Sequence, residues 1–439
     1  MDKGKTFQAF FDSIRLLSTE PYEDGLAGIA RRLNSSYYDS DSDEEHLVIV
    51  GSIGRWTAVD GASDVDALFV LPDEVYTRYD NRSGNKQSQL LSDVRTELKK
   101  RYPNSDISAD GQAVVISFTD RNYSIDLVPA FERSDGAFTF PDTNDGGHWR
   151  KTDPIPEQEA CEEAQAITQG AFLRLCNALR VWKDNTGFKF GGLLIDTLVA
   201  KFLEKHPETC STELNEYDDA LAELFAYLKS QDPDQSYWYA LGSNQQIVND
   251  GKAAFVAKAK DAYEALTTSE NDIEIVLGNL FGKRFTDCVV NSAEREAEAL
   301  WSKRYSYWPD TEQFIEDIFP VHIRYDLAID CDVSQNGFRE HTLREMLRKR
   351  FPLMKGRSLR FRVIRIDVPE PYDLYWKVRN CGEEAFRKKC VRGQIKGDEG
   401  DEAKSESTSF HGPHYVECYA VKNGVCVARS KISVPISIQ

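Results

Sequence analysis

Two short motifs near residue 50 constrain this chain more than any other feature. Gly51 and Ser52 directly follow one apolar run, and Asp64 and Asp66 open another. Side chains at positions i and i+2 of a strand point to the same face, with their Cα atoms about 6.6 Å apart. We therefore expect Asp64 and Asp66 to lie side by side. Two such carboxylates repel each other unless a cation lies between them, and Mg²⁺ is often bound by one or two carboxylates together with substrate phosphates.

A third carboxylate, Asp126, lies inside the strand-like run 123–130. An acid in so apolar a run is costly unless it is paired or binds an ion. A plainer alternative stays open for each part of the pattern taken alone. Asp126 faces water in that case, and Asp64 and Asp66 form a solvated turn after Gly61. The order of the three features along the chain favours a shared site.

The order Gly-Ser, Asp-x-Asp and a later strand Asp resembles the signature of the polymerase-β-like nucleotidyltransferases. Finer matches are similar to the bacterial SMODS nucleotidyltransferases, which are CD-NTases related to cyclic GMP–AMP synthase and oligoadenylate synthetase. The resemblance covers roughly residues 1–305. The segments that carry it are 51–57 (Gly-Ser-Ile-Gly-Arg-Trp-Thr), 63–66, 110–115, 125–130, 140–142, 149–154 and 280–285.

This resemblance implies an enzyme that condenses nucleoside triphosphates, such as ATP and GTP, into a cyclic or short linear oligonucleotide for anti-phage signalling. It implies that Asp64, Asp66 and Asp126 hold two Mg²⁺ ions, with Mn²⁺ as an alternative, for attack of a ribose hydroxyl on an α-phosphate. Gly51, Ser52 and Lys183 are implied to contact the triphosphate. The alternative for Lys183 is a surface lysine near a helix C-terminus with no contact to nucleotide. A separate effector protein is expected to read the product.

The fold class expected is α+β, in three parts. Residues 1–160 show alternating strand and helix patterns, as expected of a catalytic core with a small mixed sheet. Residues 161–305 are expected to form a helical lobe that closes the active-site cleft, and residues 306–439 a mainly β domain. Helices are predicted in 5–35 and at about 87–102, 164–183, 192–205, 212–230, 250–267 and 271–281, and hairpins at 113–131 and 415–434.

The last part resembles the C-terminal sensor domain found on SMODS and adenylyl/guanylyl cyclase-like enzymes (AGS-C). The resemblance lies in segments 375–380, 392–395 and 412–418. It implies that this domain senses a small ligand, with Trp376, Asn380, Arg392 and His414 as candidate contacts. For Trp376, a place in the core of a β-sandwich is the alternative.

Charge limits the class of partner. The chain has 54 Lys and Arg against 72 Asp and Glu, a formal charge of −18. This opposes binding of a long nucleic acid, which depends on many Lys and Arg contacts. Residues 341–396 differ, with 16 basic against 6 acidic residues. This basic stretch is consistent with an anionic ligand or an intramolecular contact, or with solvated strand faces.

The remaining features favour the cytoplasm. Nine cysteines are dispersed without a C-x-x-C pair, which favours reduced thiols. No apolar run is long enough to span a bilayer, so no membrane contact is expected, and the N-terminus lacks the apolar core of a signal peptide. Two alternative functions remain: nucleotidyl transfer to RNA or a small molecule, and an inert lobe that only senses nucleotides.

Overall fold

The computed structural model of this chain describes residues 2–118, 121, 123–249, 252–268, 272–292, 312–335, 338–349, 351–381, 385, 390–409 and 411–436. The chain divides into two compact units. The N-terminal unit comprises Lys3–Arg180 and Gly191–Ser269, and the C-terminal unit comprises Val181–Phe190 and Glu270–Gln439 together with the first two residues.

The N-terminal unit is built on a mixed sheet in which five strands follow the order β1-β2-β5-β4-β3, with β6 and β7 continuing from β5. The pair β2–β5 is parallel and the other pairs are antiparallel. The strands are β1 (Leu47–Ile49), β2 (Asp64–Val70), β3 (Asp106–Asp110), β4 (Ala113–Ser117), β5 (Ser124–Glu132), β6 (Phe138–Asp142) and β7 (His148–Thr152). The expected small mixed sheet and the hairpin β4–β5 are confirmed. Of the four residues expected to join that hairpin, 119, 120 and 122 lie outside the described residues.

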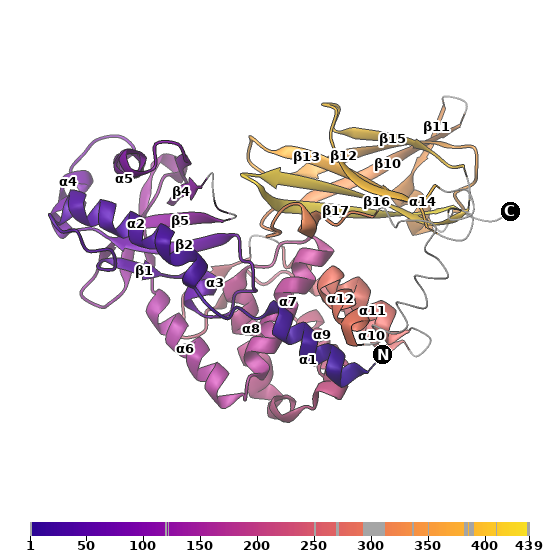
Figure 1. The fold of residues 1–439 in the computed structure, drawn as a ribbon, viewed down its shortest axis with the longest axis horizontal. Coiled ribbons are helices and arrows are strands. Elements are labelled where there is room, and N and C mark those ends of the chain that lie inside the picture. Colours follow the sequence, from indigo (N-terminus) through magenta and orange to yellow (C-terminus); the bar gives the residue numbers. More distant parts are fainter. Residues whose placement is uncertain are drawn as a thin grey trace. The chain divides into compact units, whose positions relative to one another are not determined.

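Helices cover one face of this sheet. The longest are α2 (Glu20–Tyr37), which lies across β2 and β5 in Figure 1, and α5 (Lys86–Arg101). Leu33 of α2 and Leu98 of α5 are both fully buried in a core that also contains Val65 and Ile125. Odd-numbered residues of β2 and β5 therefore face the helices, because strand side chains alternate between faces. The further elements are α1 (Lys3–Ile14), α3 (Gly51–Gly54), α4 (Asp73–Asp80), α6 (Pro154–Ile167), α7 (Ala171–Thr186), α8 (Gly192–Lys205), α9 (Tyr217–Lys229), α10 (Ala254–Thr267), β8 (Tyr237–Tyr239), β9 (Gln246–Val248) and the 3₁₀ turns η1 (Asn144–Gly146), η2 (Pro207–Ser211) and η3 (Leu214–Glu216).

Two four-stranded antiparallel sheets form most of the C-terminal unit. One has the order β11-β10-β12-β15 and the other the order β14-β13-β16-β17. The Asn423-Gly424 turn joins β16 to β17 with both residues at positive φ, as a two-residue hairpin turn requires. The mainly β character of this part and the predicted hairpin are thus confirmed. The elements are α11 (Ile273–Phe281), α12 (Lys283–Ser292), η4 (Ile315–Asp317), β10 (Leu327–Gln335), β11 (Phe338–Thr342), α14 (Leu343–Lys349), β12 (Ser358–Ile366), β13 (Asp373–Arg379), β14 (Arg392–Gly397), β15 (Ala403–Ser407), β16 (Gly412–Lys422) and β17 (Val425–Ile436).

One predicted helix was wrong in its extent. The sequence favours a single helix over 164–183, but the structure ends α6 at Ile167 and begins α7 at Ala171. Gln169 and Gly170 both have positive φ, at 52° and 86°, which breaks the helical path. The predicted division into residues 1–160, 161–305 and 306–439 stays a prediction. Segments of 161–305 belong to both units, and the 305/306 boundary lies outside the described residues.

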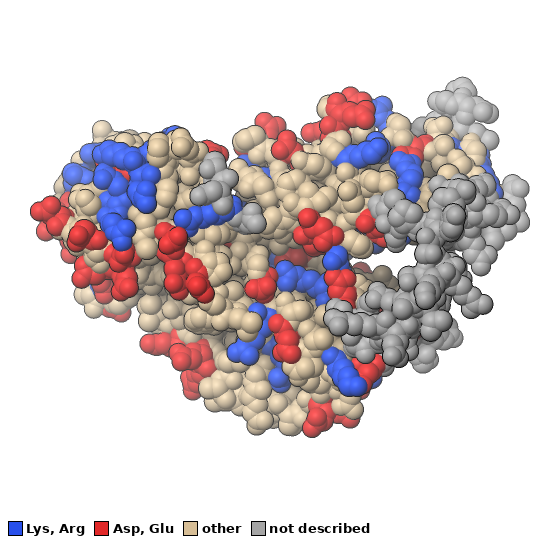
Figure 2. Space-filling model, in the orientation of Figure 1, with Lys and Arg blue, Asp and Glu red and all other residues tan. Residues whose placement is uncertain are grey.

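Surface charge is not uniform over the N-terminal unit. On the face drawn in Figure 2, Lys and Arg side chains gather over α4 and α5, with Asp and Glu on the neighbouring surface. The last turn of α5 contains Lys99, Lys100 and Arg101, and cations are favoured near a helix C-terminus. This face therefore carries patches of both signs.

Candidate active site

The parallel strand pair brings the predicted carboxylates together. The register pairs Asp66 of β2 with Asp126 of β5, and Asp64 with Ser124. All three acids have even numbers, so they lie on the face opposite α2 and α5. Further along these strands, the same face carries Leu68 and Ala130, which are buried in a second apolar cluster. The polar ends of two otherwise apolar strand faces thus form one acidic site.

Burial differs slightly among the three acids. All are partly buried, and the Oδ1 atom of Asp126 is shielded from solvent. Tyr22 lies close to Asp64: its hydroxyl donates to the carbonyl of Ala62 at 3.0 Å, and burial followed by Asp60 and Asp64 raises the pKa of Tyr22 to about 12. The phenol therefore stays protonated and remains a hydrogen-bond donor beside the acids.

The turn α3 lies directly against Asp66. The backbone N–H of Val50 donates to the carbonyl of Asp66 at 2.9 Å. Gly51 has φ = +64°, and a Cβ built on it would lie 2.0 Å from Asp66 Oδ2. A side chain at position 51 is excluded both by this close approach and by the positive φ. The structure thus sets Gly51 against Asp66, and Asp66 beside Asp126, with Asp64 on the same strand face and Ser52 next to Gly51. The metal-binding, catalytic and nucleotide-binding roles of these five residues stay a prediction.

Behind the turn lies a buried ionic cluster that the sequence analysis did not identify. Asp196 of α8 is fully buried and accepts from Arg55 Nε and from the Thr57 hydroxyl, each at 2.9 Å. Arg180 of α7 donates to the Thr57 hydroxyl at 2.9 Å and forms an ion pair with Asp196 at 2.8 Å. It also donates to the carbonyl of Gly192. This cluster, Arg55–Thr57–Arg180–Asp196, fixes the chain just after α3 to two helices.

The charges of this cluster hold one another in the ionised state. Burial alone would raise the pKa of Asp196, but Arg180 and Arg55 hold it below its usual value. Burial alone would lower the pKa of Arg180, but Asp196 raises it. A buried ion pair is stabilising only when hydrogen bonds satisfy its remaining donors and acceptors, and Thr57 and Gly192 supply two of these. The motif Arg-x-Thr at 55–57 was visible in the sequence as part of the family resemblance. Nothing in the sequence indicated that Asp196 is the partner of Arg55 and Thr57.

Lys183 lies in the part of α7 that belongs to the C-terminal unit. Its side chain is buried, with Nζ 2.5 Å from Asp184 Oδ1 and 3.2 Å from the carbonyl of Ile323. Asp184 Oδ1 also accepts from the backbone N–H of Ile323 at 2.9 Å. Lys183 is thus not a surface lysine, and its contact with a triphosphate stays a prediction.

The four candidate sensor residues have separate surroundings. Trp376 is buried in the core between the two sheets, and its indole N–H donates to Asp398 at 2.7 Å. Arg392 makes a two-bond ion pair with Glu406, at 2.6 and 2.8 Å. The remaining two contact the backbone: Asn380 donates to the carbonyl of Cys390, and His414 Nδ1 accepts from the N–H of Cys381. The core position of Trp376 matches the alternative that the sequence left open, and a ligand role for these four residues stays a prediction.

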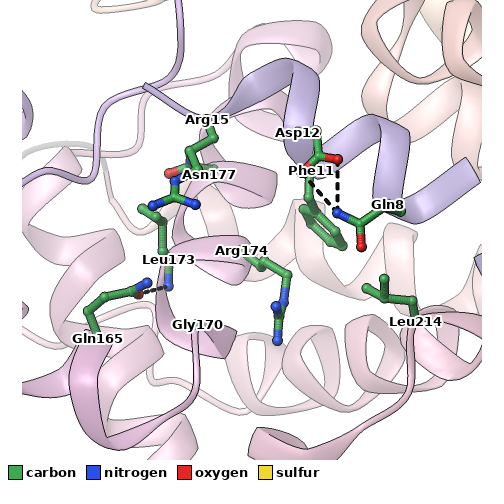
Figure 3. Close-up of a pocket in the computed structure, with 10 residues that line it drawn as sticks. All are labelled: Gln8, Phe11, Asp12, Arg15, Gln165, Gly170, Leu173, Arg174, Asn177 and Leu214. Atoms are coloured by element: carbon green, nitrogen blue, oxygen red, sulfur yellow. Dashed lines mark hydrogen bonds between the residues drawn. The ribbon is translucent and has the colours of Figure 1, made fainter. Parts of the chain in front are cut away.

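A cavity of about 140 Å³ opens elsewhere in the N-terminal unit (Figure 3). Its lining comes mainly from α1, α6 and α7 and includes Arg15, Arg174 and Gln165. Arg174 Nε also donates a hydrogen bond to the Tyr217 hydroxyl at 2.7 Å. Its lining contains none of the site residues predicted from the sequence.

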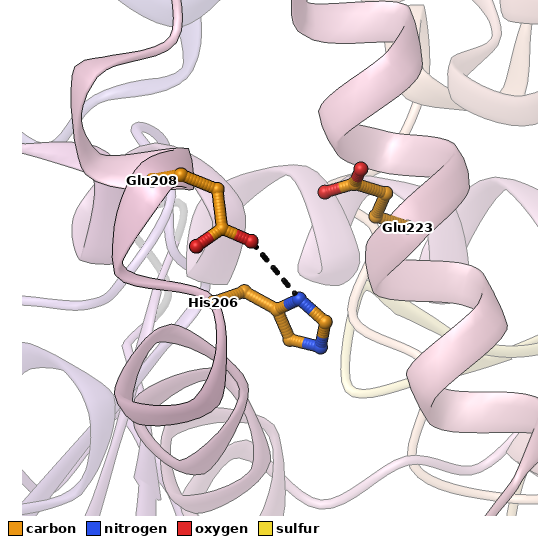
Figure 4. Close-up of side chains that lie close together, drawn as sticks. All are labelled: His206, Glu208 and Glu223. Atoms are coloured by element: carbon orange, nitrogen blue, oxygen red, sulfur yellow. Dashed lines mark hydrogen bonds and ion pairs between the residues drawn. The ribbon is translucent and has the colours of Figure 1, made fainter.

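Another cluster joins α8, η2 and α9 (Figure 4). Ligand atoms of His206, Glu208 and Glu223 lie within 4.8 Å of one another, and His206 Nδ1 is 3.3 Å from a Glu208 oxygen. Both glutamates are exposed, so this group is a separate, solvated acidic cluster. Its sequence signal is weak, because Glu223 lies 17 positions after His206. Among the described residues, no helix has both the length and the apolar character needed to cross a bilayer.

Two domain models match parts of this chain. Residues 1–164 match the model of the Second Messenger Oligonucleotide or Dinucleotide Synthetase (SMODS) domain. Residues 309–437 match that of the Adenylyl/Guanylyl and SMODS C-terminal sensor domain. A "Probable cyclic nucleotide synthase" of Bacillus cereus (strain VD146) is 23% identical over 214 residues, which cover 42% of this chain and 62% of that protein.

Solved structures of similar proteins include three from bacteria. The chain is similar to Escherichia coli MS115-1 CdnC in its complex with HORMA-deltaN (TM-score 0.48, 16% identity, covering 64% of this chain and 98% of that one). It is similar to Elizabethkingia meningoseptica CdnE cyclic dinucleotide synthase (TM-score 0.46, 12% identity, 61% and 100%). It is also similar to the Vibrio cholerae di-nucleotide cyclase DncV (TM-score 0.44, 12% identity, 66% and 88%). The two matches thus assign this chain a SMODS domain at residues 1–164 and an Adenylyl/Guanylyl and SMODS C-terminal sensor domain at residues 309–437.

Proposed function

We propose that this chain condenses nucleoside triphosphates into a cyclic or short linear oligonucleotide second messenger for anti-phage signalling. The observation that carries the proposal is the register of Asp66 against Asp126, with Gly51 packed directly on the Asp66 carboxylate. This arrangement sets carboxylates beside a turn whose backbone can approach a phosphate closely. The match of residues 1–164 to the SMODS domain supports the same proposal.

The donor set fits a hard divalent cation. Asp64, Asp66 and Asp126 present only carboxylate oxygens, the ligands that Mg²⁺ and Mn²⁺ prefer. The absent Cβ of Gly51 leaves room for the Asp66 carboxylate against the turn. We propose that these three residues hold two Mg²⁺ ions, with Mn²⁺ as an alternative. When bound, such ions stabilise charge on the attacking and the leaving oxygen of an in-line displacement.

The residues of the chain have separate tasks in this scheme. The backbone N–H groups of Gly51 and Ser52, with the Ser52 hydroxyl, bind the β- and γ-phosphates. Asp126, whose Oδ1 atom is shielded from solvent, accepts the proton of the attacking ribose hydroxyl. A bond forms between that ribose oxygen and the α-phosphorus, and pyrophosphate leaves with the electron pair of the broken P–O bond. Lys183 contacts the triphosphate after its ammonium group leaves Asp184.

The buried cluster at Asp196 positions this machinery. Arg55 and Thr57 are bound to Asp196 within a few residues of Gly51. Positioning of the reacting groups supplies much of the rate enhancement in phosphoryl transfer. The remaining parts of the proposal are cytoplasmic action, a separate effector protein that reads the product, and no long nucleic acid or membrane as partner.

Product analysis tests the proposal. The purified full chain is incubated with all four labelled ribonucleoside triphosphates and Mg²⁺ or Mn²⁺, and the products are separated after phosphatase treatment. We expect a phosphatase-resistant product that is absent with the double variant Asp64→Asn/Asp66→Asn and present with the control Asp106→Asn. Asp106 is an exposed carboxylate on β3 of the same sheet. Absence of such a product, together with label transfer to an RNA or small-molecule acceptor added in a parallel reaction, would overturn the proposal in favour of acceptor modification.

A further inference from the structure

The sheet β14-β13-β16-β17 has one apolar and one charged face. Leu374, Trp376 and Val378 of β13 point into the core. Strand alternation then places Lys377 and Arg379 on the opposite face. The register sets Glu417 of β16 between Lys377 of β13 and Lys431 of β17, and sets Tyr419 against Arg429. We call this outward surface, formed by Lys377, Arg379, Tyr415, Glu417, Arg429 and Lys431, the basic face.

Cations outnumber acids on the basic face although most of it is buried. Lys377 is 2% exposed, and Arg379 and Arg429 are each 8% exposed. The sheet itself supplies one carboxylate among them, Glu417, which lies 3.2 Å from Arg429 and 3.3 Å from Lys377. Burial alone would raise the pKa of Glu417, but Arg429, Lys377 and Lys431 lower it to about 2. Lys431 is exposed, but the three buried cations Lys377, Arg379 and Arg429 around one resident acid require further anions, because an unbalanced buried charge is strongly unfavourable.

Those anions come from the segment just before the first strand of this unit. The strap, residues Glu312–Asp317, covers the basic face. Glu312 Oε1 lies 2.7 Å from Lys377 Nζ and accepts from the Tyr415 hydroxyl at 2.6 Å, while Oε2 lies 3.2 Å from Arg379. Glu316 pairs with Arg429 at 2.8 Å. The two strap carboxylates thus balance charge that the sheet leaves in excess.

An aromatic ring lies between these carboxylates in the strap sequence. Lys377 Nζ is 4.8 Å from the centre of the Phe314 ring, within the range of a cation–π contact. The strap thus offers negative charge next to a flat aromatic ring, two features that a nucleotide also has in its phosphates and its base.

The strap makes different kinds of contact along its length. Ile315 is fully buried in a small apolar cluster with Ile323 and Tyr419. The first half of the strap is bound to the edge of the sheet through Gln313. The backbone N–H of Gln313 donates to the carbonyl of Gly393, and its side-chain oxygen accepts from the backbone N–H of Ile395. Asp317, at the other end, lies 3.5 Å from Lys283 of α12. Ile315 is thus the apolar anchor of the strap, whereas residues 312–314 are held by polar and charged contacts that a competing anion can replace.

We propose that the basic face is the ligand site of the sensor domain, that its ligand is a phosphorylated nucleotide, and that the strap occupies the site when no ligand is bound. The nucleotide phosphates replace the Glu312 carboxylate at Lys377, Arg379 and Tyr415, and the base takes the place of Phe314. Ligand binding releases residues 312–314 from β14.

Amide exchange at the strap tests this proposal in the full chain. The Asp64→Asn/Asp66→Asn variant serves as the parent, so that no substrate is consumed, and the probes are ATP, GTP and inorganic triphosphate. We expect ATP or GTP to accelerate exchange at Gln313 and Ile395, whose N–H groups hold the strap. The substitution Glu312→Gln weakens the strap without removing a cation. It should lower the nucleotide concentration for half-maximal response by roughly tenfold, the range of ordinary coupling between two ligands.

Control variants make the result specific. Arg379→Gln should abolish the response, whereas Arg365→Gln should leave it unchanged, because Arg365 is an exposed arginine of β12 paired with Asp326. Unchanged strap exchange with millimolar nucleotide, or equal half-maximal concentrations for the parent and Glu312→Gln, would overturn the proposal. An equal response to inorganic triphosphate would overturn its nucleotide part. If Arg379→Gln does not fold, the half-maximal nucleotide concentration of Glu312→Gln, compared with that of the parent, decides whether the proposal holds. The readout uses an inactive variant, so this outcome is independent of whether the chain synthesises oligonucleotides.

Discussion

Gly51 and the carboxylate of Asp66 are packed so closely that a Cβ at position 51 would lie 2.0 Å from Asp66 Oδ2. Gly51→Ala should therefore displace Asp66 and lower kcat/KM about 100-fold, the cost of misplacing a reacting group by an ångström. Gly136→Ala is the matched control, since Gly136 also has positive φ (+82°) but no neighbour within 4 Å of its built Cβ. Both variants should lose about 1–2 kcal/mol of stability from backbone strain. Equal activity of the two variants would contradict the close packing.

Asp196 is expected to be the most sensitive position outside the acidic site. Asp196→Asn leaves Arg55 and Arg180 buried without their carboxylate partner. Loss of one partner from a buried ion pair costs about 3–5 kcal/mol, so the melting temperature should fall sharply in calorimetry. Thr57→Val, which removes one hydrogen-bonding hydroxyl but no charge, should cost only about 1 kcal/mol. A similar loss for both variants would show that the charges are not the dominant contribution.

Stability of the C-terminal unit should depend on acid through Glu417. Its pKa is lowered from 4.5 to about 2 in the folded chain. A depressed pKa means that the stabilisation is complete above the unfolded-state pKa and is lost as pH falls from about 4.5 toward 2. The melting temperature of Glu417→Gln should thus lie well below that of the parent at pH 7, and the difference should shrink as the pH falls toward 3. A difference that stays constant over this range would contradict the assignment.

Lys183 offers a test that separates binding from structure. If it contacts the triphosphate, Lys183→Met should raise KM for the nucleotide roughly tenfold with little change in kcat, because a contact that is equal in ground and transition states affects KM alone. Lys189→Met is a control on the same segment, since Lys189 is partly exposed. An unchanged KM with a lowered melting temperature would instead assign Lys183 a structural role with Asp184 and Ile323.

The acidic site could be predicted from the sequence because its signals are local. The i, i+2 spacing of Asp64 and Asp66 and the one acid in the apolar run around Asp126 follow from strand geometry. Gly51 follows from the positive φ of its turn. The parallel register that sets Asp126 opposite Asp66 supplies the long-range part. The predicted helices failed where a turn was not recognised: Gln169, with positive φ, gives no clear sequence signal, although Gly170 beside it does.

The basic face was predicted only in part: Lys377 and Arg379 lie in the basic stretch 341–396, but their partners are distant in the sequence. Lys377, Glu417 and Arg429 come from three strands, and Glu312 precedes all of them by more than 60 residues. The alternation Leu-Tyr-Trp-Lys-Val-Arg at 374–379 shows one apolar and one polar face, but it does not show what covers the polar one. Trp376 was considered as a ligand contact, whereas its place in the alternation puts it on the apolar face with the core.

The most direct test of the acidic site is the rate of pyrophosphate release from nucleoside triphosphates in the presence of Mg²⁺, measured for the parent chain, Asp126→Asn and Asp106→Asn. All three proteins are first checked for equal melting temperatures. The account predicts that Asp126→Asn loses at least about 100-fold in rate, as loss of a group that stabilises the transition state does, while Asp106→Asn stays within about twofold of the parent. Parent-like pyrophosphate release by folded Asp126→Asn would contradict the claim that Asp66 and Asp126 form one active site.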